Sequence, residues 1–222
     1  MLSKSNSGDD DVTQKGYCLE LGIEEYGKIF QLQKQINHAR QNGALPDTVI
    51  LLEHHPCFTV GRREGFDHIL VGNQFLDQEG IRVYKTDRGG DITYHGPGQV
   101  VAYVLVDLRR RGYGIRDLVS RMEQAVIDLL AAHGVAAARL AGAPGIYVDG
   151  AKIAALGLRV KHGCTYHGLA FNVDMDLAPF AAINPCGYAG MPVTQCRDLG
   201  VKLSPPQAGQ ALAQALLDTI YS

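Results

Sequence analysis

Residues 88–99, here called the glycine run, constrain the fold of this chain more than any other stretch. The run reads RGGDITYHGPGQ, with four glycines and one proline among mostly polar residues. Glycine is used where the backbone needs a positive φ or where another group must come close. A continuous apolar segment of strand type follows at residues 100–106. The pattern indicates a ligand-facing rim on a rigid sheet, although a long glycine loop has the same composition.

Length and composition place the chain among ordinary globular proteins. It has 222 residues, and 46% of them are hydrophobic and 20% charged, as in ordinary soluble proteins. A chain of this length can bury a sizeable core without stabilisation by disulfides or metal ions. The formal net charge of -2 and the pI of about 6.4 favour neither nucleic acid nor an anionic membrane as a partner. No apolar stretch approaches the roughly 20 residues of a membrane span.

The N-terminal residues 1–15 are rich in Ser, Asn, Asp and Gly rather than apolar, unlike the core of a signal peptide. We expect a disordered tail there and a single domain over residues 16–222. The chain has five cysteines, an odd number, and no Cys-x-x-Cys pair. This usage predicts reduced thiols and a cytoplasmic location, with one cysteine as a candidate reactive thiol.

Hydrophobic periodicity predicts both helices and strands. The helices are expected at residues 24–41, 73–79, 115–133 and from about 204 to 221. The strands are expected at residues 17–21, 48–52, 81–85, 100–108, 145–148, 151–160 and 165–173. Asp149-Gly150 is a strong hairpin signal, and Lys161-His162-Gly163 is a second turn. Because strands and helices do not alternate regularly, we expect one α+β domain with a mixed β-sheet flanked by helices.

Cofactor motifs are missing. The glycine run matches neither Gly-x-x-x-x-Gly-Lys-Ser/Thr nor Gly-x-Gly-x-x-Gly, so no nucleotide cofactor is predicted. His54-His55-Pro56-Cys57 and His162-Gly163-Cys164 contain plausible metal ligands, but their spacing is not that of a zinc knuckle. The sequence therefore predicts no metal site.

Cys186 is the candidate reactive thiol. It lies between Pro185 and Gly187, which indicates a turn outside any strand or helix interior, unlike Cys18 within a predicted strand. Backbone N–H groups in such a turn are suited to bind an oxyanion. A half-buried structural cysteine is the other interpretation.

A thiol nucleophile needs a lowered pKa. Moving it from about 8.5 to about 7 takes roughly 2 kcal/mol, which one partly desolvated cation supplies. Three residues are candidates: Lys152, His95 and His167. Lys152 lies on an apolar strand, where a lysine either snorkels outward or is kept inside for chemistry. Histidines beside glycine more often have a structural hydrogen-bonding role.

Three consecutive arginines, Arg109, Arg110 and Arg111, follow the strand predicted at residues 100–108. We expect them to be solvated, with a docking patch for an acidic protein as the alternative.

Taken together, these segments resemble the lipoyl(octanoyl) transferase family. The resemblance covers residues 50–190 and is carried by PCFTVGR (56–62), RGGDITYHGPGQ (88–99), GAKIAALG (150–157), HGLAFNV (167–173) and NPCG (184–187). It implies the catalytic-domain fold of biotin and lipoate protein ligases. It also implies transfer of an octanoyl group from octanoyl-acyl carrier protein to a lysine of lipoyl domains in 2-oxoacid dehydrogenases and the glycine cleavage H protein.

The resemblance further implies roles for individual residues. Cys186 is the expected acyl-thioester nucleophile, and Lys152 is expected to lower its pKa. The expected acyl-binding wall consists of Arg88, Gly89, Gly90, Asp91, Ile92, Thr93, Tyr94, His95, Ala155, Leu156, Gly157, Gly168, Leu169 and Ala170. Two positions depart from the family pattern. Ala155 stands where serine is frequent, which removes a hydroxyl contact, and Cys57 stands where an aliphatic residue is usual, which argues against a catalytic role for it.

Other functions stay open at this point. The nearest is an ATP-dependent lipoate-protein ligase or another acyltransferase on the same scaffold, which needs no nucleophilic cysteine. A non-catalytic lipid-binding or carrier-docking module and a general cysteine hydrolase are the others.

Overall fold

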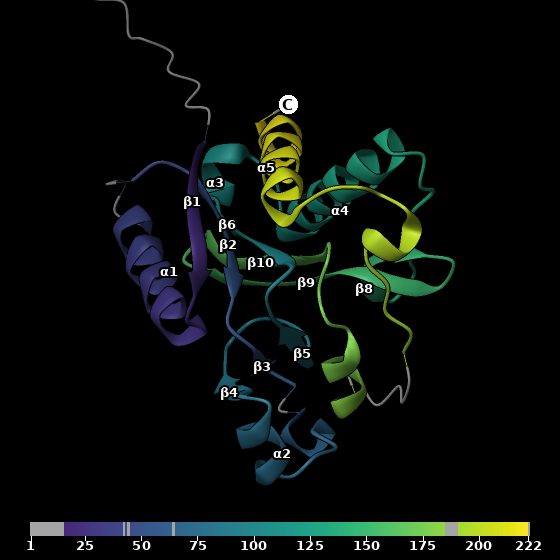
Figure 1. The fold of residues 1–222 in the computed structure, drawn as a ribbon. Coiled ribbons are helices and arrows are strands. Elements are labelled where there is room, and N and C mark those ends of the chain that lie inside the picture. The colour runs from purple at the N-terminus through teal and green to yellow at the C-terminus, as the bar shows by residue number, and fades with distance from the viewer. Residues whose placement is uncertain (1–15, 42, 44, 64, 185–190, 222) are drawn as a thin grey trace, which may run out of the picture.

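A seven-stranded mixed sheet forms the centre of the fold (Figure 1). The computed structural model describes residues 16–41, 43, 45–63, 65–184 and 191–221. In spatial order the strands are β1 (Tyr17–Glu24), β2 (Thr48–His54), β6 (Gln99–Leu105), β10 (Cys164–Asn172), β9 (Ala151–Lys161), β8 (Ala143–Val148) and β7 (Ala138–Leu140). β1 and β2 run parallel, and each of the other neighbouring pairs is antiparallel. The predicted mixed sheet is therefore confirmed.

Helices cover both faces of this sheet. α4 (Ile115–Ala132) and α5 (Pro205–Tyr221) lie side by side over one face, and α1 (Tyr26–Gln41) packs on the other (Figure 1). The apolar stripe predicted on the helix at 115–133 is buried, and Leu118 and Met122 are fully enclosed. An amphipathic helix is stabilised by burying such a stripe against a sheet.

A smaller three-stranded sheet, with β3 (Cys57–Val60) between β4 (Arg82–Lys85) and β5 (Ile92–His95), lies beside the large one (Figure 1). The short helix α2 (Asn73–Gln78) and the 3₁₀ helices η1 (Gly65–His68) and η2 (Ala178–Ala182) accompany it. The pattern analysis missed β3, β5 and β7. As β5 pairs with β3, the glycine run is partly a strand rather than a long loop.

Both predicted turns are confirmed. Asp149 and Gly150 have φ values of 49° and 82°, and His162 and Gly163 have 50° and 80°. Two consecutive positive φ values give the twist that joins antiparallel strands tightly. These turns connect β8 to β9 and β9 to β10, so the order of the strands at the functional site follows from local turn chemistry.

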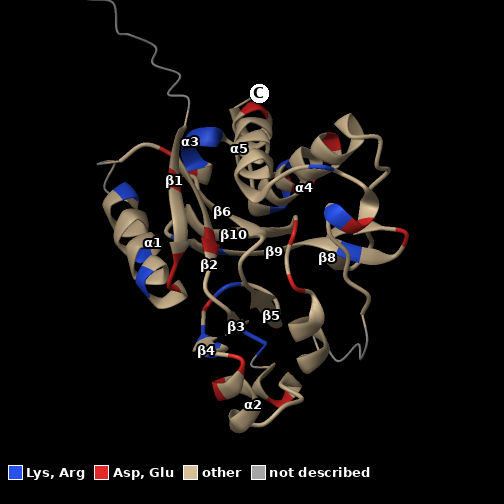
Figure 2. Ribbon diagram, viewed as in Figure 1, with Lys and Arg blue, Asp and Glu red and all other residues tan. Residues whose placement is uncertain are grey.

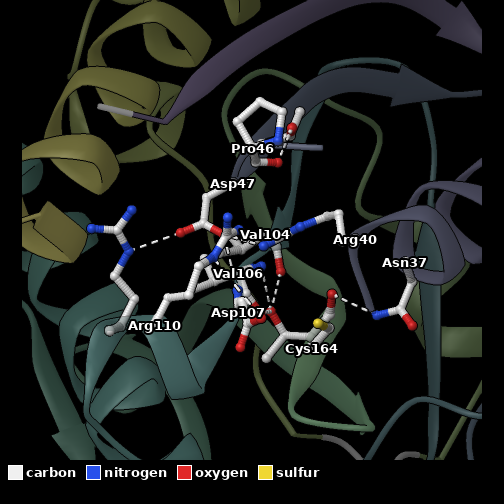
Figure 3. Close-up of polar contacts among 12 residues, drawn as sticks. Asn37, Arg40, Pro46, Asp47, Val104, Val106, Asp107, Arg110 and Cys164 are labelled. Carbon is white, nitrogen blue, oxygen red and sulfur yellow. Dashed lines mark hydrogen bonds and ion pairs between the residues drawn. The ribbon is translucent and has the colours of Figure 1, made fainter. Parts of the chain in front are cut away.

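The arginine triplet borders a buried polar cluster around Asp47, with Arg109 and Arg110 exposed. It forms the short helix α3 (Leu108–Arg111), blue over much of its length beside α5 in Figure 2. Asp47, 2% exposed, accepts hydrogen bonds from Arg110 at 2.9 Å and Arg111 at 2.8 Å and also pairs with buried Arg40 (Figure 3). The predicted solvated patch is wrong for Arg111, because a carboxylate removed from water needs such donors.

In the described part of the chain, no helix combines the length and the apolar character needed to cross a membrane.

Candidate active site

A cavity of about 930 Å³ runs along β9 and β10, between the glycine run and residues 191–193. Its size suits a small-molecule site. The residues of the expected wall that line it are Arg88, Gly89, Gly90, Asp91, Ile92, Thr93, His95, Ala155, Leu156, Gly157, Gly168, Leu169 and Ala170. Tyr94 lies outside it and packs against Phe58 and Phe180. Side chains alternate along β5, so Thr93 and His95 face the cavity, whereas the side chains of Ile92 and Tyr94 belong to the buried cluster behind β5.

Glycine allows two backbone segments to approach closely in this wall. Gly89 donates its backbone N–H to the carbonyl of Leu158 at 2.9 Å. A Cβ at Gly157 would lie 2.7 Å from the carbonyl oxygen of Gly89, and one at Gly168 would lie 1.8 Å from that of Ala102. Gly157 therefore keeps the glycine run against β9, whereas Gly168 keeps β10 against β6.

Arg88 holds the glycine run against the smaller sheet. Its guanidinium donates to the backbone carbonyl of Thr59 at 2.5 Å and to the Thr59 hydroxyl at 2.9 Å. It also donates to the carbonyl of Gly89 at 3.0 Å. An arginine with this many protein acceptors fixes the shape of the wall.

His95 starts a hydrogen-bond network that crosses the site. Its Nδ1 lies 2.7 Å from Oε1 of Gln99, and Gln99 donates to Asn172 at 3.0 Å. Asn172 donates to the carbonyl of Thr194, whose own N–H donates to the carbonyl of Lys152. Burial lowers the pKa of His95 to about 3, so the ring is neutral at physiological pH. His95 therefore acts as a structural hydrogen-bonding group.

His167 is held by an acidic partner. Its Nε2 lies 2.9 Å from one carboxylate oxygen of Asp87, and the Tyr166 hydroxyl donates to the other oxygen. Burial opposes ionisation of Asp87, but these hydrogen bonds outweigh it and lower the carboxyl pKa to about 2. Burial also lowers the pKa of His167, so a neutral ring donates from Nε2 to a carboxylate. Neither histidine is a cation beside the cavity.

Lys152 stands at the other end of the cavity from His167. Leu158, not Lys152, pairs with His167, and Lys152 lies six residues earlier on β9. Lys152 is partly buried and lines the cavity, and its Nζ lies 5.2 Å from the centre of the Tyr147 ring. Of the two placements considered for this lysine, the inward one is observed. It is the candidate cation of the site.

Cys186 lies outside the described residues, but the chain on either side of it borders the cavity. Ile183 and Met191 both line it. Each described cysteine lies elsewhere, and burial raises the pKa of each of these thiols: Cys18, Cys57, Cys164 and Cys196. Cys18 lies within the strand predicted there and is exposed on the edge strand β1. No described cysteine has the environment of an activated nucleophile.

The sequence alone missed several residues of the cavity. Tyr26 and Tyr103 close one part of it, and Ile115, Val119 and Val193 line another. Their place in the apolar pattern indicates core residues, and this pattern does not distinguish residues that line a cavity from residues that fill a core. Within the described ranges, no group of three or more His, Cys, Asp or Glu side chains is arranged to hold a metal ion.

Known proteins share both the fold and the sequence of this chain. Residues 25–217 match the lipoyl protein ligase A/B catalytic domain. The chain is 66% identical over 184 residues to an octanoyltransferase of Thiobacillus denitrificans, covering 83% of this chain and 82% of that protein. A bipartite lipoate protein ligase from Thermoplasma acidophilum matches with a TM-score of 0.73 at 17% identity, over 93% of this chain and 84% of that one. A biotin protein ligase from Aquifex aeolicus matches with a TM-score of 0.55 at 10% identity, over 93% and 70%. The chain therefore belongs to the lipoyl protein ligase A/B catalytic-domain family and, within it, to the octanoyltransferases.

Proposed function

We propose that this chain transfers an octanoyl group from the thioester of octanoyl-acyl carrier protein to a lysine of a lipoyl domain. The acyl group forms a thioester with Cys186 as an intermediate, and Lys152 accepts and donates the protons. Relatives named octanoyltransferase, 66% and 50% identical to this chain, support the reaction class.

One observation carries the proposal: the chain that follows Cys186 is bound to the backbone of Lys152 at the cavity. Lys152 donates its N–H to the carbonyl of Pro192 at 2.8 Å, and its carbonyl accepts from Thr194 at 3.0 Å. On the other side, Asn184 donates its N–H to the carbonyl of His68 at 2.8 Å. The flank after Cys186 is thereby fixed beside the candidate cation, and the flank before it is fixed at His68, which supports an interaction between Cys186 and Lys152.

The cavity wall suits an unbranched acyl chain. Its middle is lined by small and aliphatic residues of β9, β10 and β6, among them Ala155, Leu156, Leu169, Ala170 and Val101. Burial of each methylene contributes about 0.8 kcal/mol, so the methylenes and terminal methyl of an octanoyl chain together supply substantial binding free energy.

The transfer then follows in balanced proton and bond steps. The Cys186 thiol gives its proton to Lys152, and the thiolate attacks the donor's carbonyl carbon. The carbon–sulfur bond to the carrier breaks, and the leaving thiolate takes the proton from the Lys152 ammonium. The amine of the acceptor lysine next attacks the enzyme thioester and loses a proton to Lys152 as the Cys186 thiolate leaves.

The energetics of this route require no nucleotide. Exchange of the acyl group between two thioesters changes the free energy little, and conversion of a thioester to an amide lowers it. The nucleophile must stay reduced, which favours a cytoplasmic site of action. The described cysteines are all free thiols.

Intact-mass spectrometry after mixing with octanoyl-acyl carrier protein tests the proposal. The wild-type chain is expected to gain one octanoyl group that hydroxylamine removes and that a lipoyl domain discharges without ATP. Cys186→Ser is expected to gain no hydroxylamine-labile group. A labile adduct on that variant, or transfer that requires free acid and ATP, would overturn the proposal in favour of another nucleophile or of a ligase.

A further inference from the structure

We propose that Gly145 and Tyr147 of β8 form a cradle for Lys152 that fixes its Nζ at the cavity and keeps it as an ammonium. The inference rests on the function proposed above and assigns the residues that position its proton carrier. Neither residue touches the acyl group, so both act through Lys152.

The strand pairing places both cradle residues beside the lysine. Tyr147 is the register partner of Lys152. The next pair, Ile146 with Ala154, skips one residue of β9, so the register shifts beside the lysine. Such a bulge redirects the side chains next to it. Because side chains alternate along a strand, residues 145 and 147 both face the side on which Lys152 lies.

Gly145 provides space for the aliphatic part of the lysine. Its φ is +138°, a conformation that side chains rarely adopt. A Cβ at this position would lie 2.8 Å from the carbonyl oxygen of Ala154, 3.1 Å from Cε and 3.5 Å from Cδ of Lys152, so glycine here admits both the β9 backbone and the lysine stem. The Gly145 N–H points toward a carboxylate oxygen of the buried Glu123, at 3.4 Å. The lysine stem therefore crosses β8 at the residue that has no side chain.

Tyr147 provides the surface on which the ammonium rests. The ring is 5% exposed, and its centre lies 5.2 Å from Nζ of Lys152. Its hydroxyl donates to the carbonyl of Ala143 at 3.2 Å, which fixes the orientation of the ring. The face of an aromatic ring attracts a cation and not a neutral amine. The cradle thus favours transfer of the thiol proton from Cys186 to Lys152, which breaks the S–H bond and forms an N–H bond.

The test is the pH dependence of Cys186 alkylation by iodoacetamide, quantified on the peptide that contains this residue. Tyr147→Leu removes the aromatic face, and we expect the apparent thiol pKa to rise by about 0.5–1 unit. Below both pKa values, this shift slows alkylation about three- to tenfold. Tyr147→Phe keeps the face and is expected to restore the wild-type profile. Tyr147→Met, which retains bulk without the aromatic face, replaces the leucine variant if that one does not fold.

A matched control is Tyr113→Leu. The Tyr113 hydroxyl donates to the carbonyl of Ile220 at 3.2 Å, and its ring faces the Arg121 guanidinium at 4.9 Å, away from the cavity lining. This variant is expected to leave the alkylation profile unchanged. If Tyr147→Leu or Tyr147→Met shows the wild-type pH profile of Cys186 alkylation, the proposal of a cradle is overturned. A wild-type thiol that titrates like a free cysteine, or one unaffected by Lys152→Met, instead overturns the proposed function.

Discussion

The glycine run and the Lys152 corner, which consists of Lys152 and its cradle residues Gly145 and Tyr147, lie at the same cavity. The two regions use their polar side chains differently. In the run and its neighbours, the charged groups and the histidines are bound to other protein groups. Arg88 binds Thr59, His95 binds Gln99, and His167 binds Asp87. At the corner, the lysine ammonium rests on an aromatic ring beside the chain that leads from Cys186. A dense polar motif here builds the wall, whereas the proposed chemistry uses a lysine from a stretch of β9, residues 151–158, that is otherwise small or apolar.

Loss of Lys152 is expected to have the largest effect on activity. Lys152→Met keeps most of the apolar stem and removes the proton carrier. General acid–base catalysis contributes roughly 10²–10⁴-fold, so the rate of octanoyl-enzyme formation should fall by about that factor. Rapid-quench mass spectrometry measures this rate, and thermal unfolding should show little change. A fall of less than tenfold would place the proton carrier in the wall rather than at the corner.

A substitution in the cluster around Asp47 is expected to lower stability and to leave activity unchanged, because this cluster lies away from the cavity. Asp47→Ala leaves buried Arg40 without its carboxylate partner and should lower the free energy of unfolding by about 3–5 kcal/mol. Urea denaturation measures the loss, and activity per folded molecule should be retained.

The control for this prediction is Asp174→Asn, which removes an exposed ion pair with Arg197. This change should cost at most about 1 kcal/mol. Equal losses from the two variants would mean that burial of the Asp47 cluster does not set its contribution.

Two buried histidines, His95 in the wall and His54 outside the cavity lining, should also give the free energy of unfolding a marked dependence on pH. Burial lowers the pKa of His95 to about 3 and that of His54 to about 4, so both rings stay neutral in the fold. Each takes up a proton when the chain unfolds below pH 6.5. The contribution of the two neutral histidines to the free energy of unfolding is therefore complete above pH 6.5 and is lost as the pH falls toward 3–4.

Between pH 5.5 and 4.5 the two histidines should reduce the free energy of unfolding by about 2–3 kcal/mol per pH unit. Urea denaturation at several pH values measures the slope. A flat profile would show that the rings are protonated inside the fold and that the wall carries charge.

Gly157→Ala should have the smallest effect. The added methyl group meets the carbonyl oxygen of Gly89 at 2.7 Å and must push the glycine run away from β9. Overpacking of this kind costs about 1–3 kcal/mol, and we expect it as a higher KM for the octanoyl donor with kcat little changed. Steady-state kinetics separate the two.

Gly114→Ala is the matched control. A Cβ there would meet only Asp117, at an ordinary 3.5 Å, and Gly114 does not line the cavity. If this variant raised KM as much as Gly157→Ala does, the effect could not be assigned to the wall.

Local patterns in the sequence predicted most of the larger elements. Apolar periodicity located α1, α4 and α5, and the two glycine-containing turns fixed the hairpins around β9. The same reasoning missed β3 and β5, because a four-residue strand within a glycine-rich or polar segment has too few residues to show a period. The family resemblance placed Tyr94 in the wall as well, since only the pairing of β5 shows which side chains face the cavity.

The sequence by itself determined the family, the mixed α+β fold and the residue types around the cavity, because these depend on short motifs and local periodicity. The tertiary structure decided how those residues are used. It brought Asp47 to the arginine triplet and Asp87 to His167, and it placed Tyr147 under Lys152. Such contacts depend on strand register and on the burial that sets each charge, neither of which is encoded in neighbouring residues.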